Sequence, residues 1–113
     1  MSSEYRALNC SQRDFLTALG RINGPDVSGQ DIKREAERLR GSEVTHGALY
    51  PNLRALVDAG LVDRGELNRR TNWYALTEDG RRVLKQVATV QREAAGYLAL
   101  ADGGRENTTE EGR

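Results

Sequence analysis

The chain has 113 residues, of which 37% are hydrophobic and 30% charged, and 17 basic and 17 acidic residues give a net charge of zero. This size suits one domain with a modest core, and the single cysteine excludes an internal disulfide or a thiol redox pair. The start of the chain is not a signal peptide and no apolar run approaches about 18 residues, so we expect a cytoplasmic protein without a membrane segment.

Two short amphipathic helices are expected after a polar N-terminal extension, residues 1–10. Ser11 and Asp14 have the spacing of a capping box, and an apolar stripe follows them to Ile22. Ser28 and Asp31 repeat this spacing before a second helix, whose outer face mixes basic and acidic side chains. The short turn over residues 40–44 then predicts a third helix at a steep angle to the second, which is typical of a helix-turn-helix unit.

The third helix is predicted over residues 45–59, with Thr45 as its N-cap and Gly60 as its left-handed stop. Leucines at positions 49, 53 and 56 form one apolar stripe, whereas the opposite face carries small side chains. Such a helix can bring its backbone close to the major groove of DNA. The presence of Pro51 inside this helix has two explanations of equal weight: an irregular first turn that packing tolerates, or a first turn shaped to lie against DNA. The candidate DNA contacts on this helix are Thr45, His46, Gly47, Ala48, Tyr50 and Arg54.

A two-stranded hairpin is predicted from residues 61–66 and 72–76, joined by a polar turn. Arg69 and Arg70 lie in this turn, with no acidic residue between Glu66 and Glu78. A single surface arginine is most often a solvated charge, but two beside a helix-turn-helix favour phosphate binding. Trp73 is assigned to packing rather than to a ligand pocket.

A long helix over residues 77–101 completes the predicted order of elements, with Thr77 as its cap. At about 1.5 Å per residue it is over 30 Å long, more than a small domain can cover. We therefore predict that it joins two chains, although the alternative is that it folds back on Phe15 and Leu19 of its own chain. The last residues, 102–113, have no apolar side chain and are expected to form a disordered tail. The predicted dimer seam contains Val83, Val87, Val90, Ala94 and Tyr97.

The fold class expected from this order is mainly α with a small β-hairpin, a winged helix-turn-helix domain over residues 11–76 with a C-terminal dimerisation helix. The segments GALYPNLRALVDAGLVDR at 47–64 and NWYALTEDGRRVL at 72–84 resemble the PadR family of transcriptional regulators. The resemblance covers about residues 12–90. It implies a dimeric DNA-binding repressor with its third helix in the major groove and its wing on the backbone or in the minor groove. The wing is shorter than in many members and the C-terminal region is one helix, so the resemblance carries no ligand over.

Enzymatic and metal-dependent functions are not expected. His46 and Cys10 are the only soft metal ligands, they lie in different predicted elements, and neither belongs to a nucleophile–base set. No cofactor is predicted. The leading hypothesis is a homodimeric, sequence-specific DNA-binding repressor that acts on a pseudo-palindromic operator. The alternatives are a winged-helix protein-interaction module, since the net charge is neutral, and a small-molecule-responsive regulator with a pocket at the dimer interface.

Overall fold

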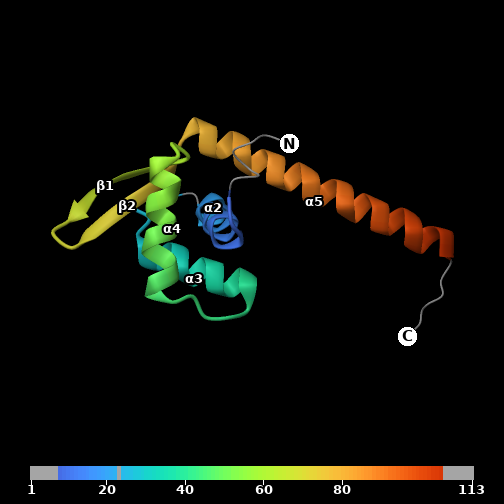
Figure 1. Ribbon diagram of the computed structural model, residues 1–113, viewed down its shortest axis with the longest axis horizontal. Helices are drawn as coiled ribbons and strands as arrows, with labels where there is room; N and C mark the ends of the chain where they lie inside the picture. Colours follow the sequence, from blue (N-terminus) through green and yellow to red (C-terminus); the bar gives the residue numbers. More distant parts are fainter. Residues whose placement is uncertain (1–7, 23, 106–113) are drawn as a thin grey trace.

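The computed structural model describes residues 8–22 and 24–105 and confirms the winged helix-turn-helix with its long C-terminal helix (Figure 1). In the described residues no helix is long and apolar enough to cross a membrane. The N-terminal extension and the tail lie outside the described residues except for residues 8–10 and 102–105. The elements are α2 (Cys10–Ile22), α3 (Gly29–Arg40), α4 (His46–Asp58), β1 (Val62–Asn68), β2 (Thr71–Leu76) and α5 (Glu78–Arg105).

Helix α2 begins earlier than the sequence pattern indicated. The capping box is formed by Asn9 and Gln12, not by Ser11 and Asp14: the Gln12 amide donates to Asn9 Oδ1 at 2.8 Å, and the Asn9 amide donates to Gln12 Oε1 at 3.2 Å. An asparagine–glutamine pair satisfies the same two amides as the usual serine–glutamate pair. The sequence offers two overlapping capping pairs, and the helix begins at the earlier one, Asn9 and Gln12.

The turn between α3 and α4 is held by a carboxylate. Helix α3 has the predicted capping box of Ser28 and Asp31, and it ends at Gly41 with a φ of 76°. Glu37 Oε2 accepts a hydrogen bond from the Val44 amide at 2.9 Å and pairs with Lys33 Nζ at 2.9 Å. These contacts lower the pKa of Glu37, with the Val44 amide as the largest cause. The turn is therefore fixed by side-chain contacts as well as by its length.

The core forms where α2, α3 and α4 meet the hairpin. The three predicted leucines of α4 are buried, and Val44 and Leu49 are both buried at the start of this helix, as a hydrophobic staple requires. The largest fully buried side chains are Phe15, Leu16, Ile32, Leu49, Leu53, Leu56, Leu61, Val44, Val62 and Val83.

The hairpin is extended by a third segment. Strands β1 and β2 are antiparallel, with Val62 opposite Leu76, and the residues before α3 pair with β2 through a bridge between Ser28 and Trp73. The Trp73 ring covers Gly65 on the neighbouring strand so closely that a Cβ there would lie 2.3 Å from the ring. Trp73 therefore packs within the hairpin. This pairing attaches the wing to the N-terminal end of α3.

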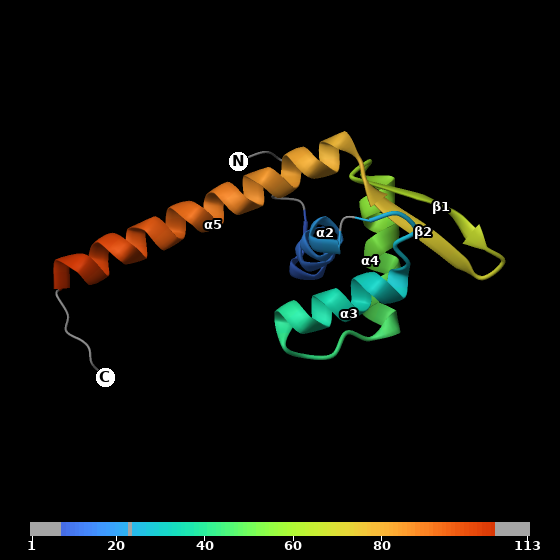
Figure 2. The same ribbon diagram turned by 180° about the vertical axis from the view of Figure 1, so that it is seen from behind.

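Helix α5 combines a packed start with a long exposed end. Val83 is fully buried and Val87 is 5% exposed within the single chain, whereas residues 91–101 are all exposed. The hairpin and α5 leave the helical part in opposite directions (Figures 1 and 2), and the molecule measures 58 × 29 × 24 Å. The helix also continues to Arg105, beyond the predicted end at residue 101, because extending a formed helix fixes only one residue per added hydrogen bond.

Two residues of the predicted dimer seam are buried within the single chain. Val83 and Val87 are covered by their own chain, as in the alternative where α5 folds back on the domain, because the first turns of α5 pack against α2. Their side chains are therefore not free to contact a second chain. Val90 is half-buried, and Ala94 and Tyr97 are exposed, Tyr97 by 77%. The remaining candidates for a seam lie in this distal part.

Candidate nucleic-acid interface

Helix α4 is defined at both ends by the predicted caps. Thr45 Oγ1 accepts a hydrogen bond from the Ala48 amide at 3.1 Å. At the other end Gly60 has a φ of 78°, its amide donates to Val57 O at 2.9 Å, and the Leu61 amide donates to Leu56 O at 3.0 Å. This pair of bonds is a Schellman motif, which ends the helix and returns the chain to the core. The apolar stripe and these caps together fix which face of α4 points outward.

The outward face consists of small and rigid residues with one arginine. Gly47, Pro51 and Arg54 are exposed, and so are Thr45 and His46 at the helix start. A Cβ placed on Gly47 would meet only Thr45 Oγ1, at 3.9 Å, so the space in front of this residue is open. The helix continues through Pro51 without interruption, and the proline ring forms part of the outer surface.

Ala48 differs from the expectation that it lies on the open front of the helix. It is half-buried and packs against the core. The reason is the approach of α2 on this side of α4, which the leucine stripe alone did not reveal. Asn52, on the same flank, donates to Ala48 O at 2.6 Å, and its Oδ1 accepts from Asn9 Nδ2 at 3.2 Å and Gln12 Nε2 at 3.0 Å. This network ties α4 to the start of α2, in line with the expectation that Asn52 leans toward the core.

Tyr50 lies on the other flank, toward α3 and the wing. Its ring is 42% exposed and stacks against His46 with ring centroids 6.1 Å apart. Its hydroxyl accepts a hydrogen bond from Gln30 Nε2 at 3.3 Å, and its edge packs over Gly29, where a Cβ would lie 3.0 Å from the ring. Tyr50 thus stands at the edge of a cleft rather than inside the core.

That cleft brings α4 and the wing together. It has a volume of about 320 Å³ and lies between the start of α3, the middle of α4 and strand β2. Tyr50 and Arg70 line it, with Gln30, Thr71 and Asn72. The sequence prediction missed Gln30, Thr71 and Asn72, because residues 20 to 40 positions apart carry no pattern that signals their contact. All five side chains can hydrogen-bond to an oxyanion.

The wing turn presents its two arginines to solvent. Asn68 Oδ1 accepts a hydrogen bond from the Arg70 amide at 3.1 Å, which closes the turn as the asparagine predicted. Arg69 and Arg70 are exposed, and in the described part of the chain neither they nor Arg54 forms an ion pair with a carboxylate. Three guanidinium groups on α4 and the wing are therefore available to an anion.

The arginines of α3 behave differently. Arg38 pairs with Glu35, which also accepts from Arg21 Nε at 2.8 Å; Arg34 pairs with Asp31, and Arg40 with Asp14. The hydrogen bonds from Arg38 and then Arg21 lower the pKa of Glu35 to about 2. The Ser28 amide is the largest cause of the lowered pKa of Asp31. These charges compensate one another, so the surface of α3 offers little net attraction to phosphate.

The potential metal ligands are dispersed over the described residues. In residues 8–22 and 24–105 no three His, Cys, Asp or Glu side chains gather as a metal site would require. Cys10 is exposed at the start of α2, and His46 lies on α4. The surface formed by α4, the cleft and the wing turn is instead suited to binding an extended polyanion.

Comparisons with known proteins identify the same architecture. The model of the transcriptional regulator PadR-like family matches residues 18–86. A complex structure of RosR, hsRosR-S1, is 36% identical over 93% of this chain and 100% of that chain, with a TM-score of 0.71. A structure of Halobacterium salinarum RosR grown from NaBr is 38% identical over 88% of this chain and 96% of that chain, with a TM-score of 0.69.

Two further relatives share less with this chain. The transcriptional activator GvpE2 of Halobacterium salinarum is 40% identical over 57 residues, which are 50% of this chain and 29% of GvpE2, so the chain spans under a third of that relative. MepR, a transcription regulator of the Staphylococcus aureus multidrug efflux pump MepA, is 18% identical with a TM-score of 0.73 over 96% of this chain and 71% of MepR. At that identity the likeness concerns the fold alone.

Proposed function

This chain belongs to the PadR-like family of transcriptional regulators, and on that premise we propose that it recognises a specific pseudo-palindromic operator as a homodimer and represses transcription. As a member of this family it is a DNA-binding transcription factor and not an enzyme. The proposal concerns which residues contact DNA, how two chains assemble and what the bound protein does.

One observation carries the DNA-binding surface: Tyr50 of α4 and Arg70 of the wing line the same cleft. A winged helix that reads DNA needs its reading helix and its wing on one side of the molecule, so that both reach one duplex. The unpaired Arg54, Arg69 and Arg70 supply positive charge on this side, although the whole chain is neutral. Local rather than overall charge thus favours DNA over a protein partner.

The proposed roles follow from position and chemistry. Gly47 and Pro51 allow the outer face of α4 to approach the major groove closely, and Arg54 reaches a guanine edge or a phosphate. The Tyr50 hydroxyl and Arg70 hold one phosphate at the cleft, while Arg69 contacts the backbone beside it. Thr45 and His46 lie at the start of α4, where polar groups meet phosphate or base edges. Ala48 stays at the edge of this surface and contributes shape only.

The homodimer is proposed to form through the distal part of α5. Val90, Ala94, Tyr97 and Ala101 recur at steps of three or four residues, the spacing of one helix face. This face continues the direction of the buried Val83, but past residue 90 the domain no longer covers it. An isolated apolar helix face of this length is unfavourable in water. A second copy with the same face buries both, and a two-fold axis suits a palindromic operator.

Repression is proposed because a dimer that occupies its operator blocks other proteins from that DNA. This effect needs no additional surface for contacts with other proteins. GvpE2 is named a transcriptional activator, so the outcome is tested directly. A reporter placed behind a selected operator should fall in output when the protein is expressed. An increase in output would contradict repression and leave DNA binding intact.

The test of DNA binding uses salt. Changing Arg69 and Arg70 together to alanine should weaken binding to all DNA sequences by the same factor. The slope of the logarithm of the binding constant against the logarithm of the salt concentration should fall in magnitude by about 1 to 2, one unit for each lost phosphate contact. Arg38→Ala is the matched control, because Arg38 is exposed but paired with Glu35 on α3. If the double variant keeps the natural slope, the wing does not contact phosphate. If the natural protein has no salt-dependent DNA binding, the protein-interaction alternative replaces this proposal.

A further inference from the structure

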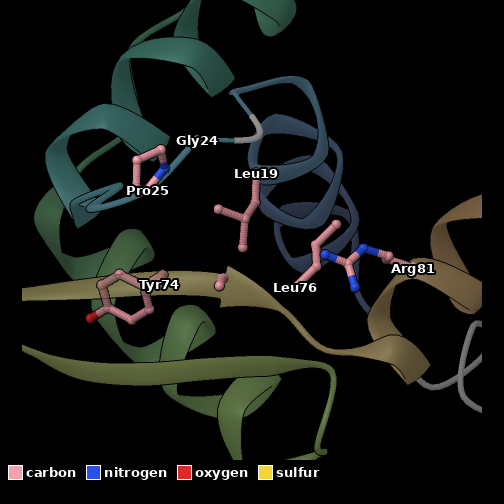
Figure 3. Close-up of a pocket in the computed structure, with 7 residues that line it drawn as sticks. Leu19, Gly24, Pro25, Tyr74, Leu76 and Arg81 are labelled. Carbon is pink, nitrogen blue, oxygen red and sulfur yellow. The ribbon is translucent and has the colours of Figure 1, made fainter.

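A second cavity lies where α2, the loop after it, β2 and the start of α5 meet (Figure 3). Its volume is about 300 Å³, at the lower end of the range for small-molecule sites. Leu19, Pro25, Ala75 and Leu76 contribute apolar surface to its wall, which Gly24, Tyr74 and Arg81 complete. The aliphatic lining favours a small apolar ligand.

One charged group faces this apolar wall. Arg81 is the only ionisable lining residue apart from Tyr74, and Figure 3 shows its guanidinium beside the Leu76 side chain. In the described part of the chain Arg81 has no carboxylate partner. Asp79, the acid two residues earlier, pairs with Arg82 at 3.3 Å and is thereby engaged elsewhere. The cavity therefore combines an aliphatic wall with a single available cation.

We propose that this cavity binds a small aliphatic monocarboxylate, with its hydrocarbon part against Leu19 and Leu76 and its carboxylate on the Arg81 guanidinium. A guanidinium matches a carboxylate with two parallel hydrogen bonds, which an uncharged amide or alcohol does not reproduce. The small volume excludes long acyl chains, and the absence of a second cation in the lining disfavours dicarboxylates.

The place of the cavity gives the ligand a role in regulation, and this part rests on the proposed function. Its wall joins β2, which carries the wing, to α5, which carries the proposed dimer seam. At the same junction α2 and α5 are in close contact, since a Cβ on Gly20 would lie 2.3 Å from Leu84 Cδ2. A bound carboxylate contacts all three elements. It thereby favours one arrangement of wing and α5, which links its binding to that of DNA.

The test measures binding to the protein without DNA. Isothermal titration calorimetry with hexanoate, and with hexanamide as the uncharged match, is carried out on the full chain. Hexanoate should bind at least about tenfold more tightly than hexanamide, and Arg81→Gln should remove about the same factor. Lys85→Gln is the matched control, because it makes the same charge change one turn later in α5, outside the cavity wall, and it should keep the natural affinity.

Each other outcome overturns the inference. Equal binding of hexanoate and hexanamide removes the role of Arg81, and equal loss of affinity in Arg81→Gln and Lys85→Gln reduces the effect to overall charge. No heat with hexanoate at millimolar concentration, in a protein that binds its operator, refutes the site while the proposed function stands. Hexanoate binding in a protein without DNA affinity supports the site and refutes the proposed function instead.

Discussion

Replacing Gly80 by alanine tests the contact that anchors α5 to the end of α4. A Cβ on Gly80 would lie 2.0 Å from the carbonyl oxygen of Leu61, which is backbone and cannot turn aside. The same junction contains two hydrogen bonds from Thr77: its amide donates to Leu61 O at 3.1 Å, and its hydroxyl donates to Gly60 O at 2.7 Å. The alanine methyl group must push α5 away and stretch both bonds.

Two effects of opposite sign determine how Gly80→Ala changes the free energy of unfolding. Alanine is favoured over glycine in a helix by about 1 kcal/mol. Overcrowding of a packed junction costs about 1–3 kcal/mol, and each weakened hydrogen bond costs about 1 kcal/mol more. The net change is a loss of roughly 2–4 kcal/mol. For a domain of this size each kcal/mol lowers the Tm by about 4–8 °C, so the Tm should fall by at least about 8 °C.

Thermal and urea unfolding followed by circular dichroism measure this change. Gly96→Ala is the control, because Gly96 lies in the same helix and a Cβ there meets nothing within 4 Å. That variant should gain about 0.5–1 kcal/mol from helix propensity alone. If Gly80→Ala is as stable as the natural protein, the close approach of α5 to Leu61 does not limit stability and the reasoning is refuted.

Three further changes test other parts of the structure. Arg38 and Arg21 hold the pKa of Glu35 at about 2, against an ordinary value of 4.5. The ionised Glu35 carboxylate therefore stabilises the fold fully above pH 4.5, and this stabilisation is lost as the pH falls through 2. The Tm difference between Glu35→Gln and the natural protein should therefore shrink over that range; a constant difference would exclude the ion pairs as its cause. Gly47→Glu should abolish operator binding in fluorescence anisotropy with an unchanged Tm, whereas normal binding would show that α4 is not the reader. Ala94→Glu should give a single chain by light scattering and Ala88→Glu, exposed on another face of α5, should not; a dimeric Ala94→Glu variant would refute the seam.

Burial decides which variants can test DNA binding by α4 and assembly through α5. Ala48 is half-buried beside α2, so a glutamate there would perturb folding as well as binding. Gly47 has open space before it and is the better position. Likewise Val87 is buried in its own chain, and a charge at that position would destabilise the domain before it affected a partner. Ala94 avoids this because it is exposed.

Local signals in the sequence were sufficient for the order of the elements and for the ends of α4, but they misplaced the cap of α2 and the end of α5. Thr45 and Gly60 mark the limits of α4 because capping hydrogen bonds involve residues only a few positions apart. Asn68 indicates the wing turn for the same reason. The motifs around Tyr50 and Leu76 indicated the family, which the match over residues 18–86 confirms.

Only the tertiary structure decided which surface covers each apolar face. The stripe on α5 reads as one continuous row, yet Val83 lies in the core and Tyr97 in solvent, because the domain ends beneath the helix. The need for glycine at position 80 arises from a carbonyl 19 residues earlier, and the cleft joins Tyr50 to a wing arginine 20 residues later. Periodicity indicates which face of a helix or strand is apolar. What packs against that face depends on contacts between residues far apart in the chain.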